Sequence, residues 1–186
     1  MICIFTWNFW LHNAITTGII SSIMASFVFL FLIFCLRPRV TISEHLARYV
    51  DKDGNKIFLF KIINRSYFKI VDLQTKMLIL TPIGTYGGNN LKIEYLKLKT
   101  DKIWYLDRRN NFFKKSEHAT FAIIFSCLDD LDAIWNHKNG SILHIEVICK
   151  HGLSGFNKVI TRNYHSDTEI KNGYYKYGNS TEIVSS

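Results

Sequence analysis

No Asp, Glu, Lys or Arg occurs between Met1 and Leu36, although the chain holds 23 basic and 15 acidic residues. All of the charged side chains therefore fall after this segment, and the net charge of +8 belongs entirely to the remainder. A boundary this sharp separates a segment suited to lipid from one suited to water. With 186 residues, the chain has room for about one domain besides a membrane anchor.

The apolar run Ala14–Leu36 predicts a membrane-spanning helix. As a helix it would be roughly 35 Å long, enough to cross a hydrocarbon layer of about 30 Å. A signal peptide is disfavoured because no basic residue precedes the run and because the run is too long. A buried core helix is the other alternative. We predict an interfacial segment over residues 1–12, a membrane helix over 13–36 and a cytoplasmic domain over 37–186.

The flanks of this helix predict its orientation. Arg37 and Arg39 follow it directly, and nothing basic precedes it. Cytoplasmic flanks carry the excess of Lys and Arg, so we expect an inner (cell) membrane protein with its N-terminus outside. The four cysteines show no metal-ligand or redox spacing, and free, buried thiols in a reducing compartment agree with a cytoplasmic domain.

Small side chains recur every fourth residue in the first half of the predicted helix, at Ala14, Gly18, Ser22 and Ser26. Residues at this spacing share one helix face, and small side chains let two helices approach closely in lipid. The stripe favours self-association or pairing with another membrane helix. The alternative is chance, because small residues are common in membrane helices.

After Pro38 the sequence reads as short β-type runs separated by turn residues. A single helical stretch, 128–136, has Asp129 or Asp130 placed to cap it. Without βαβ alternation, this pattern predicts a mainly β fold, an antiparallel sandwich or barrel. The predicted strands are 56–64, 68–80 (one strand, or two joined by a bulge), 91–98, 103–106, 120–127, 141–149, 158–164, 174–177 and 182–184.

Two stretches resemble the cytoplasmic immunoglobulin-like (E-set) domain of inward-rectifier potassium channels. The first is Lys56–Leu80, an apolar run that passes through an Asn-Arg turn. The second is Ile142–Gly178, a strand followed by a glycine-bearing hairpin, an aromatic residue and a Gly-aromatic pair. The resemblance implies an antiparallel immunoglobulin-like β-sandwich, a fold that assembles side by side beneath a membrane in that family. The residues that carry it in the second stretch are Gly152, Tyr164, Ser166, Glu169, Ile170, Gly173 and Tyr174.

Channel activity does not follow from this resemblance. Those channels have two membrane helices around a pore helix, whereas this chain has one apolar span. The segment 83–88 (IGTYGG) resembles a selectivity filter only superficially, because it lies between two predicted strands. We expect it to form a turn.

No catalytic, metal-binding or cofactor-binding pattern is found, and we expect a protein that is not an enzyme and uses no cofactor. The histidines are scattered along the chain, and no phosphate loop or nucleophile elbow occurs. The acidic residues Asp129, Asp130 and Asp132 are better explained by a solvated helix start than by a metal.

The basic surplus gathers in one segment, RRNNFFKK. Contact with anionic lipid, contact with nucleic acid or with a ribonucleoprotein partner, and a merely solvated loop are three open interpretations. The residues concerned are Arg108, Arg109, Phe112, Phe113, Lys114 and Lys115.

One anchor joined to one small β domain resembles, in outline, the single-pass membrane effectors of bacterial anti-phage systems of the retron or cyclic-nucleotide type. The leading hypothesis is a non-enzymatic effector that clusters through its helix and perturbs the membrane when a partner triggers or releases the β domain. Expected partners are membrane lipid, a second copy or another membrane helix, and a regulatory protein or ribonucleoprotein such as a reverse transcriptase with its nucleic acid. A membrane-tethered binding module, or an accessory subunit of another membrane protein, is the alternative.

Overall fold

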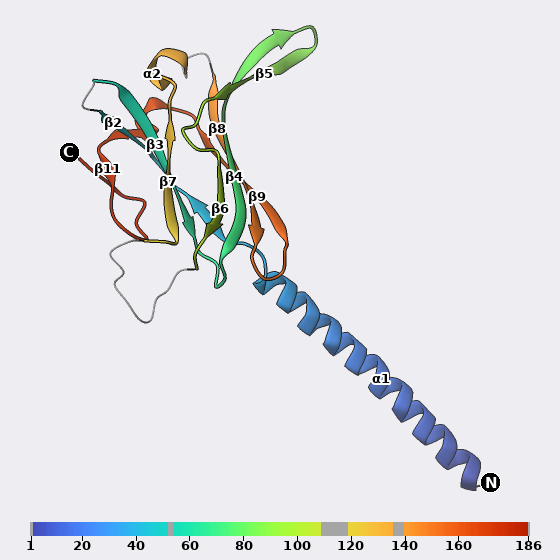
Figure 1. Ribbon diagram of the computed structural model, residues 1–186. Coiled ribbons are helices and arrows are strands. Elements are labelled where there is room, and N and C mark those ends of the chain that lie inside the picture. Colours follow the sequence, from blue (N-terminus) through green and yellow to red (C-terminus); the bar gives the residue numbers. More distant parts are fainter. Residues whose placement is uncertain (1, 52–53, 109–118, 136–139, 186) are drawn as a thin grey trace. The chain divides into compact units, whose positions relative to one another are not determined.

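A computed structural model describes residues 2–51, 54–108, 119–135 and 140–185 (Figure 1). The chain divides into two compact units, Met1–Arg37 and Pro38–Ser186. The first is a single helix and the second is built from strands. The mainly β fold with one N-terminal apolar helix, as predicted from the sequence, is confirmed.

Helix α1 runs without interruption from Ile2 to Cys35. Its segment Ala14–Cys35 has a mean hydropathy of 2.5 and is long and apolar enough to cross a membrane. No polar face divides this segment, because apolar residues surround the helix. The helical backbone continues through residues 2–12, for which the sequence predicted a separate interfacial segment; the location of those residues at an interface stays a prediction.

One sheet is centred on β3 (Lys56–Asn64), whose run KIFLFKIIN is rich in β-branched and aromatic residues. One edge of β3 pairs with β7, while the other edge pairs with β2 and then with β1, all antiparallel. A parallel strand, β10, extends the sheet beyond β2 and departs from the purely antiparallel prediction. The bounds are β1 Val40–Ile42, β2 Leu46–Val50, β7 Ala122–Cys127 and β10 Ile170–Asn172.

The second sheet is centred on β4 (Ile70–Thr85), which pairs with β6 and then β5 along one edge and with β8 along the other. A register shift between Val71 and Gln74 marks a β-bulge, and Asp72 within it has φ of 50°. The predicted long strand is therefore a single strand with a bulge. The remaining strands are β5 Gly88–Leu96, β6 Lys102–Leu106, β8 Ile142–His151 and β9 Asn157–Tyr164, and β9 pairs with β8.

The core lies between these two sheets, where alternate residues of each strand point inward. Phe60 of β3 stacks on Phe125 of β7 with ring centroids 5.4 Å apart. Cys127 and Cys149 are both buried and unpaired, in agreement with the expected free thiols. The fully buried side chains with the largest volumes are Tyr164, Phe58, Phe60, Phe125, Leu46, Ile62, Ile63, Ile70, Leu73, Met77, Ile79 and Leu131.

The C-terminal segment covers part of the outer face of the first sheet. After the 3₁₀ turn Asp167–Glu169 and strand β10, the short strands β11 (Tyr174–Tyr175) and β12 (Ile183–Val184) pair with each other. Tyr175 packs with Ala47 and Leu59 in a second, smaller apolar cluster. A face of β3 that would otherwise meet water is buried in this way.

Two local predictions are confirmed. Strands β4 and β5 form a hairpin closed by Tyr86 and Gly87, so the filter-like segment is a turn; Gly87 has the positive φ that its second turn position requires. The short helix α2 (Leu131–Ile134) begins after Asp130, whose carboxylate accepts a hydrogen bond from the Asp132 backbone N–H. Figure 1 shows the hairpin extending beyond the body of the sandwich.

Candidate functional surfaces

The small-residue stripe of α1 is exposed along its length. Ala14, Gly18, Ser22 and Ser26 are all exposed, and a Cβ added to Gly18 would meet no atom within 4 Å. The Ser26 hydroxyl donates to the backbone carbonyl of Ser22 at 2.8 Å, and Ser21 donates in the same way to Thr17. Within the stripe, the Ser26 hydroxyl is therefore satisfied by its own helix, and the small side chains around it offer a close-packing surface.

Arg37 and Arg39 are both exposed, and they differ in how the backbone around them is held. Arg37 lies just past the end of α1, and its N–H donates to the carbonyl of Phe34 at 3.4 Å. The Arg39 N–H donates to the Ser66 hydroxyl at 2.8 Å, and its carbonyl accepts from the Arg65 N–H at 2.7 Å. The first residues of the β unit are therefore fastened to the turn between β3 and β4.

The described residues include only the first residue of the basic segment RRNNFFKK. Arg108 is exposed just beyond β6, whereas Arg109, Phe112, Phe113, Lys114 and Lys115 lie outside the described residues. Two lysines from the preceding strands are engaged in ion pairs. Lys92 pairs with Glu94, and Lys102 pairs with Asp72 at 2.8 Å while lying over the Trp104 ring.

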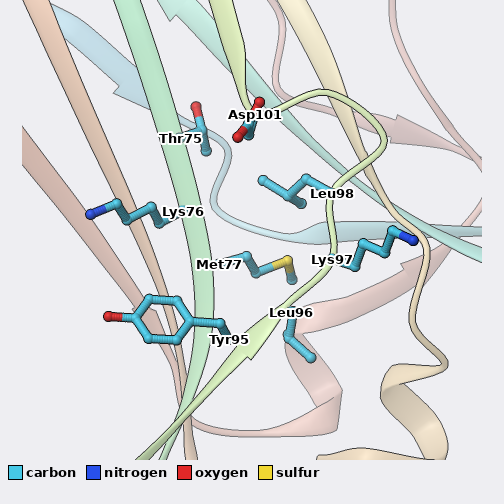
Figure 2. Close-up of a pocket in the computed structure, with 8 residues that line it drawn as sticks. All are labelled: Thr75, Lys76, Met77, Tyr95, Leu96, Lys97, Leu98 and Asp101. Carbon is cyan, nitrogen blue, oxygen red and sulfur yellow. The ribbon is translucent and has the colours of Figure 1, made fainter.

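A pocket of about 290 Å³ opens where the edge of β4 changes partner from β6 to β5 (Figure 2). In this view Lys76 and the Tyr95 ring lie on one side of β4, while Met77 and Leu96 lie on the other. The hydroxyl oxygen of buried Thr75 has no hydrogen-bond partner among the described residues. The pocket mixes apolar and polar walls without a pair of groups suited to acid–base catalysis. Its lining consists of Thr75, Lys76, Met77, Tyr95, Leu96, Lys97, Leu98 and Asp101.

A second hollow, of about 420 Å³, lies over β2 and the C-terminal segment, and its lining includes the cations Arg48 and Lys56. Both bind one carboxylate, that of Asp132, at 3.0 and 2.7 Å. Burial opposes ionisation of Asp132, but hydrogen bonds and charge from Lys56 and Arg48 outweigh it and hold its pKa below the ordinary value. Two cations sharing one carboxylate leave an excess of positive charge in the hollow. This arrangement could not be predicted from the sequence, because Asp132 lies 84 residues from Arg48 and 76 from Lys56.

Lys61 and Asn64 of β3 are buried polar residues with structural roles. The Lys61 ammonium donates to the carbonyls of Lys176 and Ser180 at 2.8 and 2.9 Å, fastening the C-terminal segment across the sheet. Its burial lowers its pKa. The Asn64 amide donates to the carbonyls of Phe68, Leu106 and Asp107, which ties the β3–β4 turn to the end of β6. Neither role could be read from the sequence, since every partner except Phe68 is distant in the chain.

His151 and Ser154 bring an imidazole and a hydroxyl together in the β8–β9 turn. The His151 Nδ1 accepts from the Ser154 N–H at 3.2 Å and lies 3.0 Å from its hydroxyl oxygen. Burial lowers the His151 pKa, and its Nε2 has no described partner, so no carboxylate orients the ring as in a catalytic triad. The contact therefore stabilises the β8–β9 turn. Within the described ranges, no three His, Cys, Asp or Glu side chains gather as metal ligands.

No protein-family model and no curated protein matches this chain.

Proposed function

We propose that this chain is a single-pass protein of the inner membrane, with its N-terminus outside and its β unit in the cytoplasm. Support comes from the uncharged, exposed segment Ala14–Cys35 and from the arginines that follow it. Arg37 and Arg39 lie on the side expected to stay in the cytoplasm. The buried thiols of Cys127 and Cys149 suit a reducing compartment.

We further propose that the protein is a non-enzymatic effector, in the manner of bacterial anti-phage membrane effectors. Its helices cluster and perturb the membrane once a partner triggers or releases the β unit. The observation that carries this proposal is the exposed stripe of Ala14, Gly18, Ser22 and Ser26, in which the Ser26 hydroxyl is bonded to the backbone of its own helix. Such a surface favours helix association through close packing. The partner that controls it is a regulatory protein or a ribonucleoprotein such as a reverse transcriptase with its nucleic acid.

Inducible expression in bacteria with a membrane-potential dye tests this function. Wild-type protein should depolarise the cells, either on expression or after phage challenge, whereas Gly18→Leu with Ser22→Leu should insert normally and fail to depolarise. Ile19→Leu with Ile23→Leu, at the same spacing but displaced by one residue, is the matched control and should behave like wild type. Wild-type protein that never depolarises the membrane, with or without phage, would contradict the proposal.

A second candidate function, a membrane-tethered binding module or accessory subunit, is favoured by the extended β4–β5 hairpin. Its side chains Ile83, Tyr86 and Leu91 are exposed, as partner-binding residues are before a complex forms. In that case Tyr86→Ser with Leu91→Ser should abolish the cellular phenotype, while Gly18→Leu with Ser22→Leu leaves it unchanged. The opposite pattern favours the clustering effector.

A further inference from the structure

Backbone contacts define the end of the β unit at which the chain enters it. Arg39 is hydrogen-bonded to Arg65 and Ser66 in the β3–β4 turn, and Val40 pairs with Asn64. If α1 spans the membrane, Arg39 lies only a few residues from the bilayer surface. The β3–β4 turn therefore marks the end of the sandwich at which the chain enters the β unit.

The β8–β9 turn lies at this same end. The N–H of Gly152 donates to the Lys69 carbonyl at 2.9 Å, and the rings of Phe68 and His151 meet edge to face at 5.3 Å. A Cβ on Gly152 would come within 2.6 Å of that carbonyl oxygen, so the two turns are held in close contact. Figure 1 shows both turns at one end of the sandwich and α2 at the other.

The exposed side chains at this end are aromatic, aliphatic or basic. Tyr67 is 72 % exposed, Leu153 62 % and Phe156 41 %. Large apolar side chains such as Leu153 and Phe156 are more often buried in a folded domain. Asp107 is the single acidic residue in segments 38–40, 65–69, 106–108 and 150–158. The exposed basic residues of these four segments are Arg39, Arg65, Lys69, Arg108, Lys150 and Lys158.

The opposite end has the reverse character. It comprises the beginning of the β2–β3 turn, helix α2 and the segment that follows β9, where acidic residues predominate. Two of its cations, Arg48 and Lys56, are engaged by Asp132, and a third, Lys97, lies beside Asp129, whose carboxylate accepts from the Lys97 backbone N–H. The acidic residues at this end are Asp51, Asp129, Asp130, Asp132, Asp167 and Glu169. The charge of the β unit is thus polarised along the sandwich, with the positive end at the chain entry.

We propose that the chain-entry end of the sandwich docks onto the surface of an anionic bilayer, with Tyr67, Leu153 and Phe156 seated among the headgroups and the surrounding lysines and arginines against anionic lipid. Each basic residue near such a surface strengthens binding about fivefold, and amphipathic or aliphatic side chains add apolar burial at the interface. The inference rests on the proposed membrane anchoring and is independent of helix clustering. Docking fixes the orientation of the β unit and presents its acidic end and hairpin to the cytoplasm.

Hydrogen exchange of the full-length protein in nanodiscs tests this docking. Peptides covering residues 65–69 and 151–156 should exchange more slowly in discs of phosphatidylcholine mixed with phosphatidylglycerol than in phosphatidylcholine alone. High salt should remove the difference, because it screens exposed charges. Lys69→Gln, Lys150→Gln and Lys158→Gln together should weaken docking by about 100-fold, and protection should disappear.

Neutralising three exposed lysines elsewhere, with Lys97→Gln, Lys99→Gln and Lys171→Gln, is the matched control and should preserve the protection. Equal exchange in both kinds of disc, or protection unchanged in the first triple variant, would overturn the proposal. If duplex nucleic acid protects these peptides and anionic lipid does not, the surface binds nucleic acid and lipid docking is wrong. Gly18→Leu with Ser22→Leu should retain protection, which separates failure of clustering from failure of docking.

Discussion

At two positions the fold requires one particular residue, because of the backbone conformation at one and a buried polar group at the other. Gly173 has φ of +131°, and a Cβ at that position would lie 2.0 Å from the Val184 carbonyl oxygen. His151 is 1 % exposed and accepts hydrogen bonds through Nδ1, which requires an unprotonated Nδ1. We therefore expect a single substitution at either residue to change the stability of the β unit.

Gly173→Ala should destabilise the β unit by about 3 kcal/mol, because it adds a steric clash to a backbone conformation open only to glycine. Gly178→Ala is the matched control: its φ is +76° but its Cβ would meet no atom within 4 Å, so about 1 kcal/mol is expected. Thermal unfolding of the detergent-solubilised chain measures both. Equal losses in the two variants would show that the close approach to Val184 has no energetic consequence.

Mild acid should destabilise the β unit through His151. Its folded-state pKa is lowered by burial, so the unfolded chain binds a proton first and stability falls as the pH drops below about 6.5. Asp132, with its pKa held below 3.8, loses its contribution only at lower pH. His151→Gln should flatten the pH dependence of the melting temperature between neutral pH and pH 5. An unchanged slope in that variant would rule out His151 as the cause.

At the scale of elements, strand β3 is buried on both faces. Its even-numbered residues from Phe58 onward enter the core between the sheets, while Leu59 and Lys61 are covered by the C-terminal segment. The Tyr175 hydroxyl donates toward the carbonyl of His45 at 2.5 Å and lies near Ser43 and the Leu59 carbonyl. The C-terminal segment is thus bonded to the sheet as well as packed on it.

Tyr175→Phe should loosen this segment while keeping its ring in place. Removal of the hydroxyl leaves buried acceptors without a donor, at a cost of about 1–3 kcal/mol. Faster hydrogen exchange is therefore expected for the peptide covering residues 176–184. Tyr49→Phe serves as the control, because it removes a hydroxyl from the partly exposed ring packed against Tyr174. It should leave exchange in that peptide unchanged. Unaltered exchange in Tyr175→Phe would mean that packing alone holds the segment.

At the scale of the whole molecule, the core of the β unit should behave as one cooperative body. Burial raises the pKa of both Cys127 and Cys149 to about 11, so neither forms appreciable thiolate near neutral pH. Both thiols should resist alkylation in the native protein and become reactive together as denaturant unfolds the sandwich. Mass spectrometry of the two cysteine peptides measures this. Alkylation of either cysteine under native conditions would indicate that its sheet opens locally.

Local sequence patterns were sufficient for most of the elements. Hydropathy predicted α1, because a long uncharged run has few alternatives, and β-branched runs predicted β3 with its observed bounds. They missed β1, β2 and β10, which are short and carry no strong alternation. The stripe on α1 followed from helical spacing alone. The chemistry of RRNNFFKK, mostly outside the described residues, stays open.

What the sequence determined by itself was therefore the division into an uncharged apolar helix and a charged β unit, the mainly β class and the small-residue helix face. Those properties depend on neighbours in the chain. Only the tertiary structure decided which distant residues meet. The Lys61 ammonium binds the carbonyl of Ser180, 119 residues away, and the Lys69 carbonyl accepts a hydrogen bond from Gly152 in the β8–β9 turn. The basic, aromatic end of the sandwich arises in the same way, because strand pairing brings separate turns to the place where the chain enters the domain.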